Sequence, residues 1–207
     1  MKKIKIFVCF ILLNITACKT DNNIVLIEQL KAINYNGKTI YEHNGKPFTG
    51  QVVDNQQKNN KIVNFFVDNG LLNGPYKEVN EKNATILETT YKNGMLHGSY
   101  KTFFESGTLQ EELMYNAGYL EGVRKYYWPN GMTKEINEYK NGRLIYFTSL
   151  FFSNGKLRKK IYFNTYGKRD SIWTEYHING TIKDSTLYSN GTLIETYQFD
   201  KNGIKRN

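Results

Sequence analysis

The chain has 207 residues, with 28 Lys and Arg against 19 Asp and Glu, a sequence pI near 9.3 and only three prolines. Two cysteines are too few for a disulfide framework, so packing and backbone pairing must stabilise the fold. After the first eighteen residues no apolar run is long enough to form a transmembrane helix.

The N-terminal segment resembles a bacterial lipoprotein signal. Lys2, Lys3 and Lys5 precede an apolar stretch at 6–15 that is too short to span a bilayer as a mature helix. It ends in Ile-Thr-Ala-Cys, which resembles a lipobox. The resemblance implies that the chain is cut before Cys18 and that this cysteine is acylated. An ordinary secretory peptide is the alternative.

Three regions follow from this interpretation. We predict a removed signal peptide at 1–17, a lipid-anchored tether at 18–23 and a folded domain at 24–207. We expect a place in the bacterial cell envelope. The outer membrane is favoured because Lys19 stands where aspartate commonly marks inner-membrane retention in enteric bacteria.

The rest of the chain is built on a repeat of about 24 residues. One series of turn glycines has this spacing, and a second series falls midway between its members. A fixed period indicates one supersecondary unit copied along the chain, each copy covering its neighbour. The first series is Gly70, Gly94, Gly118, Gly142, Gly167 and Gly191, and the second is Gly107, Gly131, Gly155, Gly180 and Gly203.

The segments between these glycines are typical of β-strands. Residues 108–115 place Leu109, Glu111, Leu113 and Tyr115 on one face, and no segment has a helical period. Many of the glycines follow asparagine, which favours the type I′ hairpin turn with two positive φ angles. The asparagines expected in such turns include Asn93, Asn130, Asn141, Asn154 and Asn190.

The predicted fold class is therefore all-β, an elongated, twisted or curled single-sheet meander of stacked β-hairpins. The region before Gly70 is expected to be a degenerate copy whose strand pair runs through 56–60, and no second domain is expected. An aromatic recurs eight residues after each second-series turn. Cross-strand pairs of such aromatics would hold the strands in register. These residues are Tyr91, Tyr115, Tyr139, Phe163 and Tyr188.

Residues 98–122 resemble the bacterial variant of the MORN repeat, which occurs in proteins often labelled YwqK-type antitoxins. The turn glycines, the leading Tyr100 and the aromatic pair Phe103-Phe104 recur in phase over about 45–203. The sequence departs from the pattern where Tyr146 and Ser171 replace the second glycine after the turn, and where Arg124 aligns with Tyr100. The resemblance implies a repeat fold and an antitoxin or immunity role.

Adjacent aromatic pairs before the second-series turns are the candidate partner-binding residues. Neighbours on a strand point to opposite faces, so each pair would place one ring on either side of the sheet, where sugars or an extended peptide could stack. The alternative is that sheet curl and long Lys or Glu stems cover both rings. The candidates are Phe103, Phe104, Tyr127, Trp128, Phe151 and Phe152.

Catalytic and metal chemistry is not expected. His43, His97 and His177 lack ligand spacing and are expected to be exposed near turns, so we predict no metal and no cofactor. An acidic column could form from Glu111, Glu135 and Asp184, at a spacing that a pair of glycosidase carboxylates would need. Lys159 interrupts this column, and Glu–Lys pairing across strands explains such a pattern without catalysis. We predict that the protein is not an enzyme.

Positive charge concentrates late in the chain. Loss of the three leader lysines leaves 25 basic residues against 19 acidic ones, a net of +6. Behind a lipoprotein signal this favours attraction to anionic envelope surfaces over nucleic acid, and solubility of a long sheet is the alternative. The late cluster comprises Lys156, Arg158, Lys159, Lys160, Lys168, Arg169, Lys205 and Arg206.

Two functions remain open from the sequence. The leading hypothesis is a non-enzymatic, lipid-anchored envelope repeat protein that binds a protein or glycan partner, anchored to the membrane by its acyl chains. The alternative is an antitoxin or immunity protein that neutralises a toxin partner.

Overall fold

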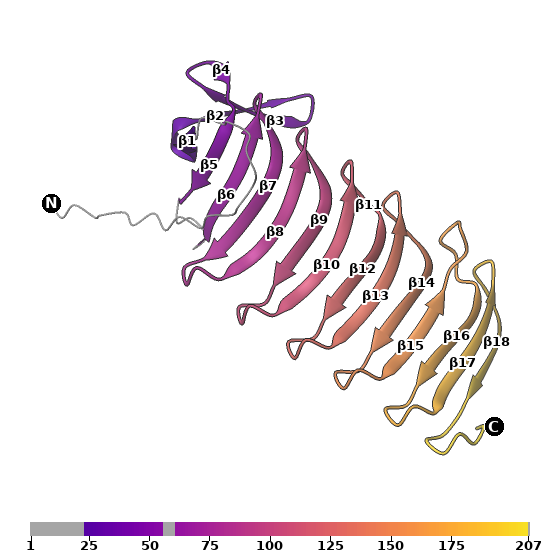
Figure 1. Cartoon of the computed structure of the whole chain (residues 1–207). Helices are drawn as coiled ribbons and strands as arrows, with labels where there is room; N and C mark the ends of the chain where they lie inside the picture. Colours follow the sequence, from indigo (N-terminus) through magenta and orange to yellow (C-terminus); the bar gives the residue numbers. More distant parts are fainter. Residues whose placement is uncertain (1–22, 56–60, 207) are drawn as a thin grey trace, which may run out of the picture.

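The computed structural model describes residues 23–55 and 61–206, and these form one long sheet with a small second sheet at its N-terminal end (Figure 1). The predicted signal peptide, the predicted acylation of Cys18 and the segment 56–60 lie outside the described residues. No α-helix occurs in the described part of the chain, where a single 3-10 turn, η1, spans Ile27–Gln29. The all-β prediction is confirmed.

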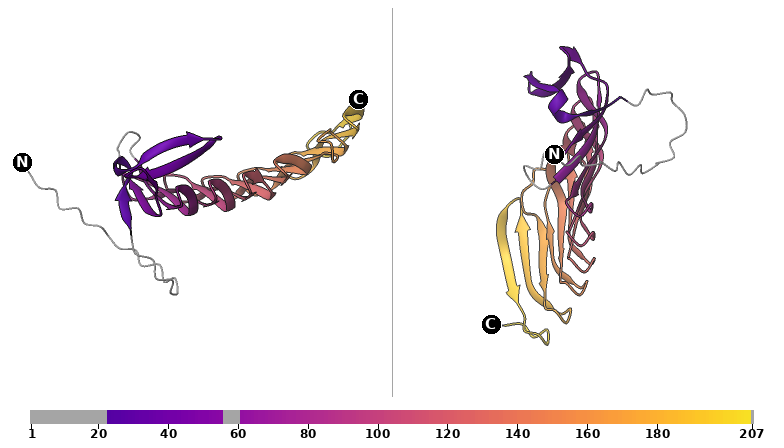
Figure 2. Two further views of the ribbon diagram at one scale, coloured as in Figure 1. Left: turned by 90° about the horizontal axis from the view of Figure 1, so that it is seen from above. Right: turned by 90° about the vertical axis from the view of Figure 1, so that its left-hand side faces the viewer.

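The large sheet has 15 strands and follows the order of the chain from β5 onwards. All neighbours are antiparallel except β1 and β5, which pair in parallel, and β11 is a short strand that pairs only with β10. Side views show a thin, twisted single layer (Figure 2). The strands are β1 Ile24–Leu26, β5 Gly50–Asp54, β6 Lys61–Asp68, β7 Leu71–Asn80, β8 Thr85–Lys92, β9 Met95–Phe103, β10 Leu109–Asn116, β11 Tyr119–Leu120, β12 Gly122–Tyr127, β13 Thr133–Lys140, β14 Arg143–Phe151, β15 Leu157–Tyr162, β16 Ser171–Tyr176, β17 Ile182–Ser189 and β18 Thr192–Gln198.

The N-terminal region differs from the degenerate repeat that the glycine spacing predicts. Two tight turns, at Asn36-Gly37 and Asn44-Gly45, lie only eight residues apart, so the strands between them are short and fold onto one another. They form a separate three-stranded sheet of β2 Lys31–Tyr35, β3 Lys38–His43 and β4 Lys46–Pro47.

This region closes the first end of the large sheet. Val52 and Val67 on the sheet are completely buried beside Val25, Phe48 and Phe65, in the main apolar cluster of the molecule. A repeat sheet needs such a covering at its ends, because a terminal repeat has no neighbour to bury its apolar side chains.

The upper rim, defined as the first-series turns, has the predicted type I′ geometry at most positions. Asn93 and Gly94 have φ values of 51° and 80°, and the Asn141 and Gly142 pair is similar. Five of the six turn glycines, all except Gly167, also donate their N–H to a carbonyl 22 residues earlier in the chain. These bonds run from Gly70 to Phe48, Gly94 to Leu72, Gly118 to Leu96, Gly142 to Leu120 and Gly191 to Arg169, at 2.7, 2.7, 2.8, 2.9 and 2.7 Å.

The lower rim, defined as the second-series turns, is built differently, and the type I′ prediction is wrong there. Gly131 and Gly155 have positive φ, but Asn130 and Asn154 do not. The Gly131 N–H bonds to the Trp128 carbonyl at 2.8 Å, which closes a four-residue turn followed by one left-handed glycine.

Asparagine is useful in these lower turns for its side chain rather than for a positive φ. The Asn130 Oδ1 accepts the Met132 N–H at 3.1 Å, and its Nδ2 donates to the Ser153 carbonyl of the next hairpin at 2.8 Å. The Asn179 amide bonds to the Lys201 carbonyl in the same way, at 2.8 Å. The turns at Asn130 and Asn179 are therefore fixed locally and also tied to the next turn.

One upper-rim turn breaks the period. The 25-residue step from Gly142 to Gly167 produces a turn at 164–168 with the lower-rim pattern, in which Gly167 N–H bonds to Asn164 at 2.9 Å. Sheet pairing continues up to this turn, where the Phe163 N–H donates to the opposed Tyr146 carbonyl at 2.7 Å, in the register that the aromatic at this position has in other copies. The extra residue is thus absorbed in the rim, and the sheet continues unbroken.

A left-handed residue also recurs inside the strands, a few residues after each upper turn. Gly74, Gly98 and Gly122 have φ values of 111°, 84° and 80°, and the ladder register shifts nearby. Tyr146 and Ser171, which replace this glycine, keep φ at 63° and 58°. The two replacements therefore preserve the geometry at the cost of strain, because side chains disfavour this region.

Relief of that strain gives a testable prediction. Tyr146→Gly is expected to raise the free energy of unfolding by about 0.5 to 1 kcal/mol, because the left-handed conformation costs a tyrosine more than the added chain entropy of glycine does. Urea unfolding followed by circular dichroism measures it.

Two reverse substitutions are matched controls. Gly122→Ala has open space around the new Cβ and should lose about 1 kcal/mol through strain alone. Gly98→Ala should lose more, because its Cβ would lie 2.8 Å from the Thr90 hydroxyl oxygen. A destabilised Tyr146→Gly variant would show that the Tyr146 side chain, not its backbone, decides the stability at this site.

Candidate functional site

The long sheet presents two faces of different chemistry. The aromatic face is defined by a row of directly opposed residues: Phe65 on β6, Tyr76 on β7, Thr89 on β8 and Tyr100 on β9. Rings on this face contact one another in a chain, with centroids 5.4 Å apart for Tyr41 and Phe65, 5.9 Å for Phe65 and Tyr76, 5.5 Å for Tyr76 and Tyr91, and 5.7 Å for Tyr100 and Tyr115.

The recurring aromatic column also belongs to this face. Tyr91, Tyr115, Tyr139 and Tyr188 each oppose a leucine that lies two residues after an upper-rim glycine, as in the pair Tyr91 and Leu96. Burial raises the pKa of the Tyr91 and Tyr100 hydroxyls. The column therefore supplies packing within each hairpin.

The middle of the aromatic face is polar. Arg124 on β12 opposes Asn137 on β13, which opposes Thr148 on β14, in the row that earlier repeats fill with Tyr76, Thr89, Tyr100 and Leu113. Arg124 bonds to the Glu111 carboxylate and lies 4.4 Å from the centroid of the Tyr126 ring. The Thr148 hydroxyl donates to Asn137 at 2.7 Å, and both residues are buried.

The predicted acidic column lies on this face in the expected register. Glu111 and Glu135 both oppose Tyr126, so they sit two strands apart, and Asp184 opposes Glu175. Its carboxylates are engaged in structural contacts: Glu135 accepts the Asn137 amide at 2.7 Å and Lys159 pairs with Glu175 at 3.3 Å. Cross-strand Glu–Lys pairing therefore explains Lys159.

The opposite face, here called the ladder face, carries alternating charges. Lys77, Glu88, Lys101, Glu112 and Lys125 oppose one another in turn across β7 to β12. Lys77 and Glu88 are 2.8 Å apart, and Lys125 and Glu112 are 3.2 Å apart. Opposite charges on directly paired residues favour this register over one that is shifted by one residue.

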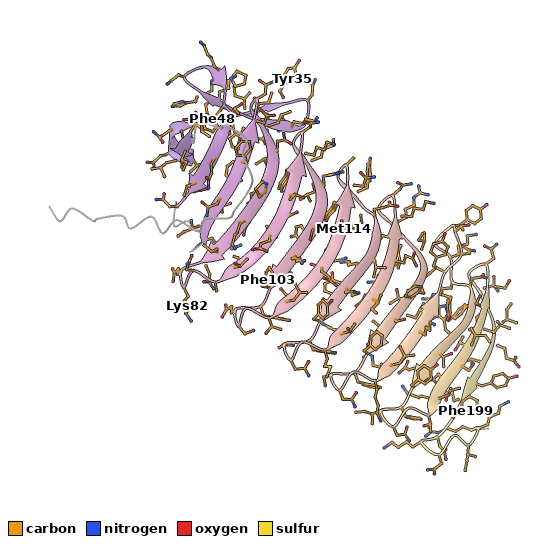
Figure 3. All side chains as sticks on the ribbon, viewed as in Figure 1. Tyr35, Phe48, Lys82, Phe103, Met114 and Phe199 are labelled. Atoms are coloured by element: carbon orange, nitrogen blue, oxygen red, sulfur yellow. The ribbon has the colours of Figure 1, made fainter. Side chains whose placement is uncertain are left out.

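The ladder face also exposes apolar side chains that sequence reasoning missed. Met114 and Val123 are 49% and 43% exposed, and Ile172 and Leu187 form a second exposed pair farther along the sheet. The signal was available, because all four alternate with inward residues on their strands. Met114 is labelled at the middle of the sheet in Figure 3.

The six predicted partner-binding aromatics lie together along the lower rim, where Phe103 is labelled in Figure 3. Phe103, Tyr127 and Phe151 end their strands, and the residue after each begins the turn. All six are half-buried. Trp128 donates from Nε1 to the Phe151 carbonyl at 3.3 Å, and the Tyr127 hydroxyl donates to Glu112 at 2.7 Å.

The hydrogen bond from Tyr127 shifts the titration of both partners. It lowers the pKa of Glu112, with a smaller contribution from Lys125 that acts in the same direction. Burial, and after it the Glu112 carboxylate, raises the pKa of Tyr127 to about 12. The bond is therefore complete only while Glu112 is ionised and Tyr127 is protonated.

We predict a pH-dependent effect of Tyr127→Phe on stability. The lowered pKa of Glu112 contributes stability that is present above its unfolded value, about 4.3, and is lost as pH falls through the folded value. The variant should therefore lose about 1 kcal/mol at pH 7 and less at pH 3.

Tyr176→Phe is the matched control for that measurement. Tyr176 holds the equivalent position in a later hairpin and makes no side-chain hydrogen bond to the described residues. Removal of the Tyr176 hydroxyl should change the free energy of unfolding little, and by the same amount at pH 3 and pH 7. An equal loss at pH 3 and pH 7 for Tyr127→Phe would contradict the role of the Glu112 charge.

The three histidines are half-buried rather than exposed, so that expectation is wrong. His43 packs against Phe48 with centroids 6.1 Å apart, and His177 Nε2 lies 3.2 Å from the Phe199 carbonyl. These two histidines lie beside turns.

Within residues 23–55 and 61–206, no three His, Cys, Asp or Glu side chains are grouped so that they could hold a metal ion. Across the same residues, no helix has the length and apolar character needed to span a membrane.

Comparison with known proteins supports the repeat. The family described as MORN repeat variant matches residues 96–117 and 120–141, which are two adjacent repeats of the sheet. The curated proteins contain no match to this sequence. One solved structure, described as the GtfA/B complex bound to UDP and GlcNAc, is 13% identical over 49% of this chain and 22% of its own, with a TM-score of 0.32. That similarity is too low to carry an argument.

Proposed function

We propose that this protein is a non-enzymatic, lipid-anchored repeat protein of the bacterial envelope that binds a protein or glycan partner through its sheet. The observation that carries the proposal is the repetition of one surface pattern: a half-buried aromatic pair recurs along the lower rim at three successive hairpins, as Phe103-Phe104, Tyr127-Trp128 and Phe151-Phe152. MORN repeats generally act as binding or scaffold modules. An extended, regularly spaced surface suits an extended partner.

A binding role is also consistent with the state of the carboxylates. Glu111 is paired with Arg124, and Glu175 accepts both Lys159 and Lys183, at 3.3 and 2.8 Å. Groups held this way position neighbouring strands.

The anchor is the most direct part of the proposal to test. Cys18→Ser should move the protein from the membrane fraction to the soluble fraction of cells, because acyl chains supply the membrane affinity. Cys9→Ser is the matched control: it removes a thiol from the part that is cut away, and should leave the protein with the membrane. Retention of Cys18→Ser in the membrane, or equal release of both variants, would overturn the anchor.

The aromatic rim gives a second prediction. Tyr127→Ala with Trp128→Ala should weaken capture of the partner from envelope extract by about tenfold or more, as for a central aromatic contact. The bait is the chain from Lys19, which keeps every described residue. Because both side chains also make hydrogen bonds, circular dichroism must first show that the variant is folded.

Met114→Ala with Val123→Ala is the control pair, on the exposed part of the ladder face. Unchanged capture by a folded rim variant would remove the aromatic rim from the proposal, and loss in the control pair instead would move the contact to the ladder face. Capture of one stoichiometric toxic protein would favour the antitoxin or immunity alternative.

A further inference from the structure

Charge divides the sheet into two halves. Residues 122–206 contain 15 Lys and Arg against seven Asp and Glu, whereas 23–55 and 61–121 together contain eight against eleven. The half from β12 to β18 is therefore strongly cationic, and the half next to the N-terminal region is slightly acidic. These halves lie at opposite ends of the elongated sheet (Figures 1 and 2).

The cations of the second half sit on aromatic rings. Every cation–ring contact in the described residues involves a Lys or Arg from residue 124 onwards, whereas rings contact one another in both halves. The charge lies 4.9 Å from the ring centroid for Lys134 on Trp128, 5.1 Å for Lys160 on Tyr162 and 4.8 Å for Arg169 on Trp173.

Most of these cations lack an acidic partner. Arg124, Lys125, Lys159 and Lys183 form ion pairs, but within the described ranges Lys134, Arg158, Lys160 and Arg169 form none. Ion pairs are as sparse in the first half, so the excess of 15 Lys and Arg over seven Asp and Glu, rather than the lack of pairs, is what favours an anionic partner.

The arrangement favours a polymer over a flat membrane. Arg143 and Lys168 follow upper-rim glycines, Lys156 follows a lower-rim glycine, and Lys160 lies on the ladder face. The positive charge therefore surrounds this half on its rims and a face, whereas docking on a bilayer would need it on one side. Lys134 on β13 and Arg158 on β15 each precede a residue that opposes Leu150, so they lie two strands apart, about 10 Å, and a chain with repeated negative groups can meet several such cations.

We propose that residues 122–206 bind an acidic polysaccharide, with its carboxylates or phosphates on the lysine and arginine heads and its sugar rings against the neighbouring aromatics. The proposed envelope function determines only where in the cell the protein would meet this polysaccharide, and the binding itself does not rest on that function. The anchored tether joins the sheet at β1, roughly 50 Å along the strand order from β15, so the glycan would be held away from the anchor.

The test measures binding of the chain from Lys19 to polygalacturonate, with neutral dextran as a blank, by biolayer interferometry at low and high salt. The variant is Lys134→Ala, Arg158→Ala and Lys160→Ala combined. The matched control is Lys31→Ala, Lys46→Ala and Lys92→Ala combined, which removes the same charge from exposed, unpaired positions in the first half. Circular dichroism verifies that both fold.

We expect the first variant to lose roughly tenfold in affinity, the control to change by less than twofold, and binding to weaken at high salt. Equal losses in both variants would overturn a localised site, and absence of binding to polygalacturonate at low salt would overturn the proposal. Tighter binding to phosphatidylglycerol vesicles or to duplex DNA than to polygalacturonate would overturn the polysaccharide assignment. Release of the protein from membranes is measured separately through Cys18, so a failed anchor and a failed glycan site give different results.

Discussion

The hydrogen bond from five of the six upper-rim glycines to a carbonyl 22 residues earlier is the constraint on which the sheet depends. The bond links the turn of one hairpin to the start of the preceding one, as from Gly94 to Leu72. The ideal Cβ of Gly94 would lie 3.5 Å from Leu71 and that of Gly142 3.6 Å from Tyr119, which are ordinary contacts, whereas that of Gly70 would lie only 2.7 Å from Ile40. Positive φ therefore selects glycine along this rim, and the bond to the preceding repeat recurs with the 24-residue period.

Rim contacts matter because the sheet is one layer thick. Away from the N-terminal end, few side chains on either face are fully buried, so the hydrophobic energy of each repeat is small. The aromatic chain, the alternating charges of the ladder face and the rim hydrogen bonds each add roughly 0.2–1 kcal/mol per pair. Stability accumulates from repetition, and this allows individual repeats to change without loss of the fold.

The sequence predicted the periodic parts of the molecule and failed where the period fails. Spacing located the hairpins and the column from Tyr91 to Tyr188, because each repeat imposes the same local requirement. It could not distinguish the two rims, since Asn-Gly is compatible with a type I′ turn and with a left-handed glycine after a bonded asparagine; Asn130 shows the second use. The small sheet of β2 to β4 was missed because it depends on contacts with Phe48 and Val52, not on a repeat.

The candidate site was only partly accessible from the sequence for a related reason. Alternation placed Phe103 and Phe104 on opposite faces, but the turn begins between them, so their exposure depends on how the next hairpin lies over the rim. Charge, by contrast, is additive and needs no exact orientation, and the late basic cluster could be identified without a structure. Its meaning becomes clear only in three dimensions. Rings contact one another in both halves, but among the described residues lysine and arginine lie over rings only from residue 124 onwards, as Arg169 does over Trp173, so the second half is the one equipped to meet an anion.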